Sequence, residues 1–291
     1  MSVLCLGKFD ALHRGHRALA ERAVAQGEPV CLLSFSGMAE TLGWQSRLPL
    51  TAPSDRARIL AAWPGKPVEA ELPFAEIRAL DADGFVRLVQ ARLDATALVV
   101  GEDFRGGQGR QADVAAFTEA GKAVGVAILA VPPIADAEGP VSSTRVRAAL
   151  AAGEVTVAEA LLGRRHRLVG RVVRGDGRGR QIGIPTANLG ERENQEPGTG
   201  VYAAWAYVGQ QRVPAVVNIG RVPTAGADRP LTVEAHLLDW HTDLYEAPLA
   251  LEFVQRLRDE RRFAGFPELV TQIHADIAAA TKVFAGSAGV P

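Results

Sequence analysis

The chain has 291 residues, a length that favours about two domains. Hydrophobic residues make up 47% and charged residues 22%, which is ordinary for a globular protein and ample for two cores. The net charge of −1 gives no global field that would draw the chain to nucleic acid or to an anionic membrane. Cys5 and Cys31 lie in apolar runs, which favours buried thiols in a reducing compartment over a disulfide. Because no signal-like segment or long apolar stretch occurs, we expect a soluble, cytoplasmic protein without a membrane partner.

The first half of the chain alternates short apolar runs with amphipathic segments. We expect strands at residues 3–6, 30–35, 97–100 and 126–131. We expect helices at residues 11–25, 54–63 (opened by Ser54 as a cap), 82–93, 114–124 and 142–152. This alternation predicts an α/β domain with a parallel, doubly wound sheet, whose ligands bind at the carboxyl ends of the strands.

The second half of the chain is rich in strand-like segments separated by turn signals. We expect strands at residues 168–174, 201–208, 212–219, 232–238 and 249–257, followed by one helix at 267–281. Successive strands without intervening helices predict a small antiparallel barrel with a terminal helix. We place the boundary so that the domains span residues 1–158 and 159–291.

The stretch GRVVRGDGRGRQIGIPTANL, residues 170–189, is the most informative part of the sequence. A glycine-rich turn with nearby arginines suits a polyanion, because glycine lets the backbone approach a ligand closely. Thr186 and Asn188 are two apart, so an extended strand projects both to one face. Their oxygens are of the kind that a phosphate-bound Mg²⁺ accepts. The alternative for the glycines alone is an ordinary loop before a barrel strand.

This string resembles the nucleotide-binding segment of the riboflavin kinase family, G-x-x-x-G-R-x-x-G-x-P-T-A-N. The resemblance implies a metal site at Thr186 and Asn188 for Mg²⁺. It also implies ATP binding by Gly177, Gly179, Arg180, Gly183 and Pro185.

Glu234 is an acidic residue inside an otherwise apolar, alternating strand, where burial would raise its pKa toward that of a useful base. The pattern alone leaves open an ordinary outward-facing carboxylate, because the apolar neighbours lie on the opposite face. The family resemblance implies that Glu234, in V-E-x-H-L-L-D, is the general base that activates riboflavin. It also implies that Arg258, in the charged run LRDERRF, lies near the flavin.

The first expected strand is followed directly by LGKFDALHRGH, residues 6–16. His13 and His16 are three apart and would share a face of a helix near its N-terminus, where imidazole donors can hold a triphosphate. The alternative is a pair of histidines that merely fill surface or core. The string resembles the phosphate motif H-x-G-H of the nucleotidyltransferase superfamily. Its longer form resembles the FMN adenylyltransferase module of bacterial FAD synthetases, which implies a Rossmann-like domain with nucleotide contacts at Gly7, Phe9, Asp10 and Gly15.

Two later strings support this resemblance. VGEDFR resembles the family's V-G-x-D-F-R and implies flavin binding by Asp103, Phe104 and Arg105. VSSTRVR resembles I-S-S-T-x-I-R and implies a second phosphate-binding site. It comprises Ser142, Ser143, Thr144 and catalytic Arg145 at a helix N-terminus. The alternative there is a Ser/Thr helix cap with solvated arginines.

The first domain departs from the family pattern in four places. Ala11 replaces a usual glycine, Gly106 replaces an aromatic residue, and Ala112 replaces a glycine before Asp113. The family's F-x-P-H-P is absent, since residues 35–39 read FSGMA. The phosphate-binding residues match, while part of the flavin side differs.

The resemblance implies a bifunctional enzyme that phosphorylates riboflavin to FMN in the barrel and adenylylates FMN to FAD in the first domain. ATP and Mg²⁺ serve both steps, and the partners are these small molecules. The alternative is a riboflavin kinase whose degenerate first domain is structural or regulatory. A nucleic-acid protein that uses the arginines between residues 164 and 180 is disfavoured, because stacking aromatics are missing there.

Overall fold

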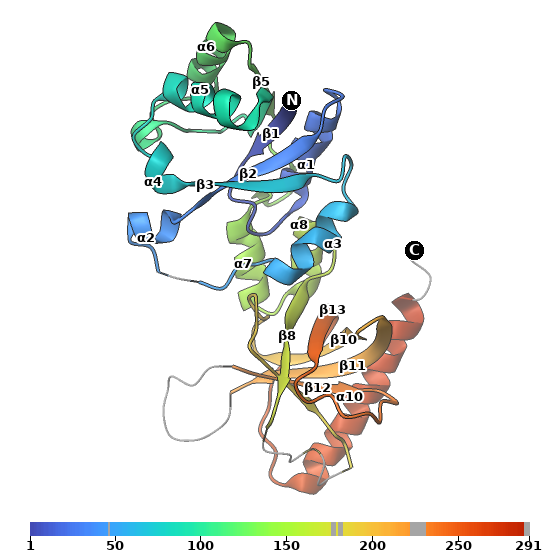
Figure 1. Ribbon diagram of the computed structural model, residues 1–291. Coiled ribbons are helices and arrows are strands. Elements are labelled where there is room, and N and C mark those ends of the chain that lie inside the picture. The colour runs from blue at the N-terminus through green and yellow to red at the C-terminus, as the bar shows by residue number, and fades with distance from the viewer. Residues whose placement is uncertain (46, 176–178, 180–182, 222–230, 288–291) are drawn as a thin grey trace. The chain divides into compact units, whose positions relative to one another are not determined.

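The computed structural model describes residues 1–45, 47–175, 179, 183–221 and 231–287. The chain divides into two compact units (Figure 1). The first unit comprises Met1–Arg47 and Asp55–Ser143, and the second comprises Leu48–Ser54 and Thr144–Pro291. That residues 48–54 join the second unit was not expected from the sequence. The boundary expected between residues 158 and 159 stays a prediction.

The first unit is built on a five-stranded parallel sheet of order β3-β2-β1-β4-β5, which confirms the expected α/β architecture. The strands are β1 (Ser2–Leu6), β2 (Val30–Ser36), β3 (Val68–Pro73), β4 (Ala95–Gly101) and β5 (Ala127–Val131). The sequence missed β3, because this edge strand alternates with acidic residues and exposes most of its side chains. The chain order reverses between β1 and β4, which is where such sheets bind their ligands.

Helices cover both faces of this sheet, so its inner strands β1, β2 and β4 are mostly apolar and buried. They are α1 (Arg14–Val24), α2 (Met38–Leu42), α3 (Arg56–Ala61), α4 (Phe74–Ile77), α5 (Ala82–Leu93) and α6 (Val114–Val124). The 3-10 turn η2 (Gln108–Arg110) and a small hairpin of β6 (Ala135–Asp136) and β7 (Gly139–Pro140) complete its connections. A further 3-10 turn, η1 (Pro53–Asp55), begins in the segment 48–54 that belongs to the second unit.

The two cysteines lie on opposite faces of the sheet, Cys5 in one apolar cluster and Cys31 in the other. Both are buried free thiols, as expected. Burial raises the pKa of Cys5 to about 12 and also raises the pKa of Cys31. Both thiols are therefore held in the unreactive protonated form.

The expected Ser54 cap is wrong. Ser54 lies in the 3-10 turn η1, and its backbone N–H donates to the carboxylate of Glu193 at 3.0 Å. The α-helix begins only at Arg56. The Ser54 amide is therefore satisfied from a residue 139 positions away, which no local pattern can indicate.

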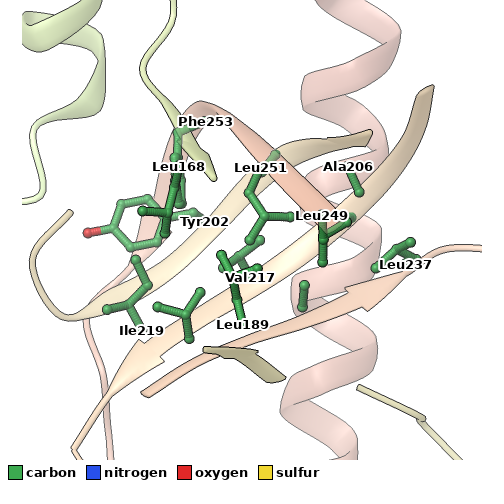
Figure 2. Packing of buried hydrophobic residues seen from close by; sticks show 14 of the residues in the cluster. Leu168, Leu189, Tyr202, Ala206, Val217, Ile219, Leu237, Leu249, Leu251 and Phe253 are labelled. Atoms are coloured by element: carbon green, nitrogen blue, oxygen red, sulfur yellow. The ribbon is translucent and has the colours of Figure 1, made fainter. Parts of the chain in front are cut away.

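The second unit contains a closed six-stranded barrel of order β10-β11-β12-β9-β8-β13, which confirms the predicted antiparallel barrel. The strands are β8 (Arg167–Val173), β9 (Ala187–Gly190), β10 (Gly200–Val208), β11 (Gln211–Gly220), β12 (Thr232–Leu237) and β13 (Pro248–Arg258). Alternate residues of each strand fill the interior. Figure 2 shows Leu168, Leu189, Tyr202, Val217 and Phe253 gathered inside the barrel.

Three helices accompany the barrel in the second unit: α7 (Ser143–Ala151), α8 (Val155–Leu162) and α10 (Phe266–Ser287). The helix α10 lies along the outside of the barrel, where Phe284 packs on Trp205 with ring centroids 4.5 Å apart (Figure 1). The final helix is thus confirmed and is longer than expected. Within the described part of the chain, no helix is both long and apolar enough to cross a membrane.

Candidate active sites

Glu234 lies on strand β12 in the wall of the barrel. Its neighbours Val233 and Ala235 point into the apolar interior, so strand alternation places Glu234 on the outer face. In register, Glu234 lies opposite Asn218 on β11 and opposite Asn188 on β9. Three polar side chains on adjacent strands therefore form one row.

This row borders a cavity of about 570 Å³, which we call the Glu234 cavity; it is also lined by Thr186, Gly179 and Gly220. A second cavity of about 440 Å³, the Trp240 cavity, is lined by Gly183, Pro185 and the aromatic Trp240 and Tyr245. Thr186 lines both cavities. The row of polar residues and the glycine-rich segment therefore meet where the two cavities adjoin.

The described residues of the glycine-rich segment are closely packed. The carbonyl of Gly179 accepts the N–H of Ile184 at 2.8 Å. A Cβ on Gly179 would lie 2.3 Å from the Ile184 carbonyl oxygen and 3.3 Å from the Thr186 hydroxyl, so only glycine fits. Gly183 has a φ of +75°, a conformation that favours glycine. Gly177 and Arg180, also expected to bind ATP, lie outside the described residues.

Two further residues, for which no role was expected from the sequence, pack against this segment. The Nδ1 atom of His236 lies 2.8 Å from the carbonyl oxygen of Pro185. Gly175 leaves room for Asn188, since a Cβ there would lie 2.2 Å from the Asn188 amide nitrogen. His236 lies two residues after Glu234, so both side chains project from the same face of the strand. This spacing could have indicated His236 as a residue of the site.

The first unit carries the histidine pair directly after β1. His13 is the N-cap of α1, and its Nδ1 accepts the N–H of His16 at 3.3 Å. The two rings stack with centroids 3.7 Å apart and an interplanar angle of 16°. The expected helix start at residue 11 is wrong, because Leu12 has a φ of +48° and cannot be helical. The histidines therefore meet through the cap, not through two positions on one helix face.

Close backbone packing surrounds this pair. A Cβ on Gly15 would lie 3.1 Å from the His13 ring and 3.9 Å from the carbonyl oxygen of Val141. The histidine turn thus lies beside the residue that precedes Ser142 and Ser143. Gly7 packs against the ring of Phe9, which is fully buried. Asp10, also expected to contact the nucleotide, is half-buried in this same turn.

The expected second phosphate-binding site lies where α7 begins, at Ser143, and Thr144 and Arg145 occupy the first turn of this helix. Arg147 is engaged elsewhere, since its Nη1 donates to the carbonyl of Leu48 at 3.1 Å. The helix begins one residue later than expected, and Arg145 remains the arginine of this motif proposed for phosphate.

A third cavity, of about 670 Å³, lies in the first unit beyond the carboxyl ends of β1, β2 and β4. We call it the Phe104 cavity. Its aromatic lining consists of Phe35, Trp44, Phe74, Phe85, Phe104 and Phe117. Its cations are Lys8, Arg78, Arg105 and Arg110, and its described lining includes no Asp or Glu. Burial, with a smaller effect of Arg110, lowers the pKa of Lys8.

The departure at Gly106 has a steric reason. A Cβ there would lie 2.9 Å from the ring of Phe104 and 2.9 Å from the ring of Phe117. These rings pack edge to face with centroids 5.2 Å apart. Glycine at 106 therefore lets Phe104 and Phe117 form the cavity wall that an aromatic side chain at this position would displace.

Of the other residues expected to bind flavin in this unit, some line the Phe104 cavity and one does not. Arg105 lines the Phe104 cavity, and its Nη1 lies 3.3 Å from the carboxylate of Asp113. Asp103 is not in the lining, because its carboxylate folds back over Gly101. The structure thus brings Phe104 and Arg105 to the cavity and leaves Asp103 beside it.

Comparisons with known proteins cover both units. The family model described as FAD synthetase matches residues 1–145, and the one described as riboflavin kinase matches residues 162–284. The chain is 40% identical to a bifunctional riboflavin kinase/FMN adenylyltransferase from Pseudomonas fluorescens over 98% of its own length and 94% of the relative's. The chain belongs to the bifunctional riboflavin kinase/FMN adenylyltransferase family.

Other members of the bifunctional family match over nearly the whole chain. The protein from Escherichia coli K12 is 37% identical, over 97% of this chain and 92% of its own. A crystal structure described as a macrolide-efflux protein from Streptococcus pneumoniae is 28% identical, with a TM-score of 0.86 over 96% of this chain and 93% of its own. Both domains of this bifunctional family member thus have a counterpart of the same fold in one solved chain.

In the kinase domain, Arg258 is tied to α10. Its guanidinium contacts the carboxylate of Asp276 through Nε at 2.9 and 3.2 Å and through Nη2 at 2.8 Å. Asp276 is buried and also accepts from the Gln272 amide at 2.7 Å. Arg258 lines neither cavity of the barrel. This geometry gives Arg258 a fixed structural contact, and its expected flavin contact stays a prediction.

We expect Asp276→Asn to destabilise the protein by on the order of 3 kcal/mol, because it leaves a partly buried guanidinium without its counter-charge. Urea unfolding of the full chain measures the loss. The matched control is Asp259→Asn, whose exposed carboxylate pairs with Arg256 at 3.1 Å and contributes little. An unchanged midpoint for Asp276→Asn would contradict the structural reading of this pair.

Proposed function

We propose that the barrel binds riboflavin in the Glu234 cavity and ATP in the Trp240 cavity, and that phosphate passes between them beside Thr186. The observation that carries this proposal is that Thr186 borders both cavities while Glu234 and Asn188 lie in register on its wall. Trp240 and Tyr245 offer aromatic surface on which a purine base can stack.

Glu234 is the general base of this step. Its carboxylate accepts the proton of the ribityl 5′-hydroxyl as that oxygen bonds to the γ-phosphorus of ATP. The bond from the γ-phosphorus to the β,γ-bridging oxygen breaks, so FMN and ADP are the products. Backbone of the turn at Gly179 and Gly183, with Gly177, Pro185 and Arg180, binds the phosphates.

The residues present fit Mg²⁺ carried in with ATP. Thr186 and Asn188 offer a hydroxyl and an amide oxygen on one cavity wall. Among the described residues, no group of three or more His, Cys, Asp or Glu side chains could hold a metal ion by itself. A hard cation here would therefore take most of its ligands from phosphate oxygens, and it would neutralise phosphate charge.

The first unit adenylylates FMN. The Phe104 cavity suits FMN, because its aromatic walls match the flavin ring and its cations match the phosphate. A phosphate oxygen of FMN bonds to the α-phosphorus of ATP, and the bond to pyrophosphate breaks. His13 and His16 of this unit stabilise the departing pyrophosphate. ATP contacts in this unit come from Gly7, Phe9, Asp10, Gly15, Ser142 and Ser143. The family resemblance also assigns stabilisation of pyrophosphate to Arg145 and an ATP contact to Thr144, both in the first turn of α7.

Two observations favour two activities over a kinase alone. The relatives that match over the whole chain are named for both activities. The Phe104 cavity is also complete around Gly106, so the departure there leaves an aromatic wall intact. A cytoplasmic location and the absence of a nucleic-acid partner remain part of this proposal.

The test is to incubate the purified protein with riboflavin, ATP and Mg²⁺ and to separate the flavins. FMN followed by FAD is the expected result. FMN that accumulates, with no FAD from added FMN and ATP, would support the kinase-only alternative. The absence of both products would refute the proposed function.

A further inference from the structure

Glu260 is a second carboxylate that lines the Glu234 cavity. Its charged neighbours have partners: Arg258 pairs with Asp276, Asp259 with Arg256, and Arg261 with Glu268. The exposed carboxylate of Glu260 has no hydrogen bond or ion pair with any residue that the structure describes. It therefore lies at the cavity with its acceptor capacity unused by the described chain.

Gly220 makes room for this carboxylate. A Cβ on Gly220 would lie 2.2 Å from Oε1 of Glu260 and 2.8 Å from its Cδ. Gly220 is the last residue of β11, and its φ is not in the range that requires glycine. A side chain at this position would therefore displace the Glu260 carboxylate, while the backbone conformation does not require glycine.

The strand register places Glu260 relative to the general base. Asn218 and Gly220 are two apart on β11 and share its outer face. Asn218 is paired with Glu234, whereas Gly220 lies against Glu260. Two residues of an antiparallel strand span about 7 Å. The two carboxylates therefore lie along one wall, separated on the scale of a short polyol chain.

We propose that Glu260 is a specificity-determining residue of the kinase site that accepts hydrogen bonds from the ribityl hydroxyls of riboflavin. This proposal rests on riboflavin binding in the Glu234 cavity. An ionised carboxylate only accepts hydrogen bonds, and a polyol offers several donors. With Glu234 at the terminal hydroxyl, Glu260 holds inner hydroxyls of the same chain and sets the register of the reacting oxygen.

The test compares steady-state kinase kinetics of Glu260→Ala, Gly220→Ala and the double variant. We expect Glu260→Ala to raise the KM for riboflavin about 10- to 100-fold, the effect of losing hydrogen bonds to a charged group. We expect little change in kcat. Gly220→Ala displaces the carboxylate and raises KM similarly, and the double variant shows no further rise.

Three controls separate the outcomes. Asp259→Asn removes an adjacent, paired carboxylate and should leave KM unchanged. FAD formation from added FMN reports that the first unit is intact, and an unchanged kcat for FMN formation reports that the barrel of each variant is folded. Lumiflavin, which lacks the ribityl chain, should inhibit wild type and Glu260→Ala equally as a competitor of riboflavin.

An unchanged KM in Glu260→Ala would overturn the proposal while FMN formation still supported the kinase site. Weaker inhibition by lumiflavin in that variant would also overturn it, because Glu260 would then contact the flavin ring. A wild-type protein that forms no FMN would instead refute the proposed function on which it rests.

Discussion

Glu234→Gln is expected to lower the rate of FMN formation about 10²- to 10⁴-fold, the usual contribution of a general base. The amide keeps the size of the side chain and its place opposite Asn188 and Asn218 but cannot take the proton of the ribityl hydroxyl. The measurement is FMN formed from riboflavin and ATP at saturating substrate, followed by separation of the flavins.

The same preparation carries its own control. FAD formation from added FMN should stay near the wild-type rate, because that step belongs to the first unit. Glu246→Gln, which changes an exposed carboxylate of the second unit, should leave both rates unchanged. A Glu234→Gln protein that makes FMN at the wild-type rate would remove Glu234 from the role of base.

His16→Ala is expected to have the reverse effect and to lower FAD formation from FMN about 10²- to 10³-fold, as the loss of one donor to a developing anion does. The imidazole of His16 stacks on that of His13 at the start of α1, where the helix dipole also favours phosphate. Release of pyrophosphate measures this rate directly.

A second variant keeps this test decisive if alanine disturbs the packing of His16 on Phe9 and His13. His16→Gln retains a hydrogen-bond donor and should recover part of the rate. His274→Ala changes an exposed histidine on α10 and should have no effect. Riboflavin phosphorylation should persist in all three, and intact FAD formation in His16→Ala would exclude the histidine pair from the mechanism.

The sequence by itself determined much of the fold, where the determining interactions are local. The helices α5 and α6 begin and end at the predicted residues, because Asp81 and Asp113 cap their N-termini through their own side chains. Gly125 ends α6 in the left-handed conformation that glycine favours. The strands of the second half likewise predicted a barrel, because apolar residues occur at alternate positions along each strand.

Three features could be settled only by tertiary structure. The pattern around Glu234 was compatible with an ordinary surface carboxylate, and only pairing with Asn188 and Asn218 showed that it lies in a polar row. Arg258 was expected at the flavin from its motif, but a contact with Asp276, 18 residues away, fixes its charged group. At position 106 the sequence lacks the aromatic residue of the family pattern. In the structure, Gly106 leaves room for the rings of Phe104 and Phe117.

The same division applies to the Gly-rich string that ends in Pro-Thr-Ala-Asn. Its residue types alone determined that the chain handles phosphate, because glycine backbone, hydroxyl and amide oxygens are chemically suited to it. Only the closed barrel decided which carboxylates face that string. Glu234 and Glu260 lie 46 and 72 residues beyond Asn188 in the chain. Strand register and close packing at Gly220 bring them to one cavity. Local chemistry is encoded by neighbours in sequence, while the geometry of catalysis depends on contacts between distant strands.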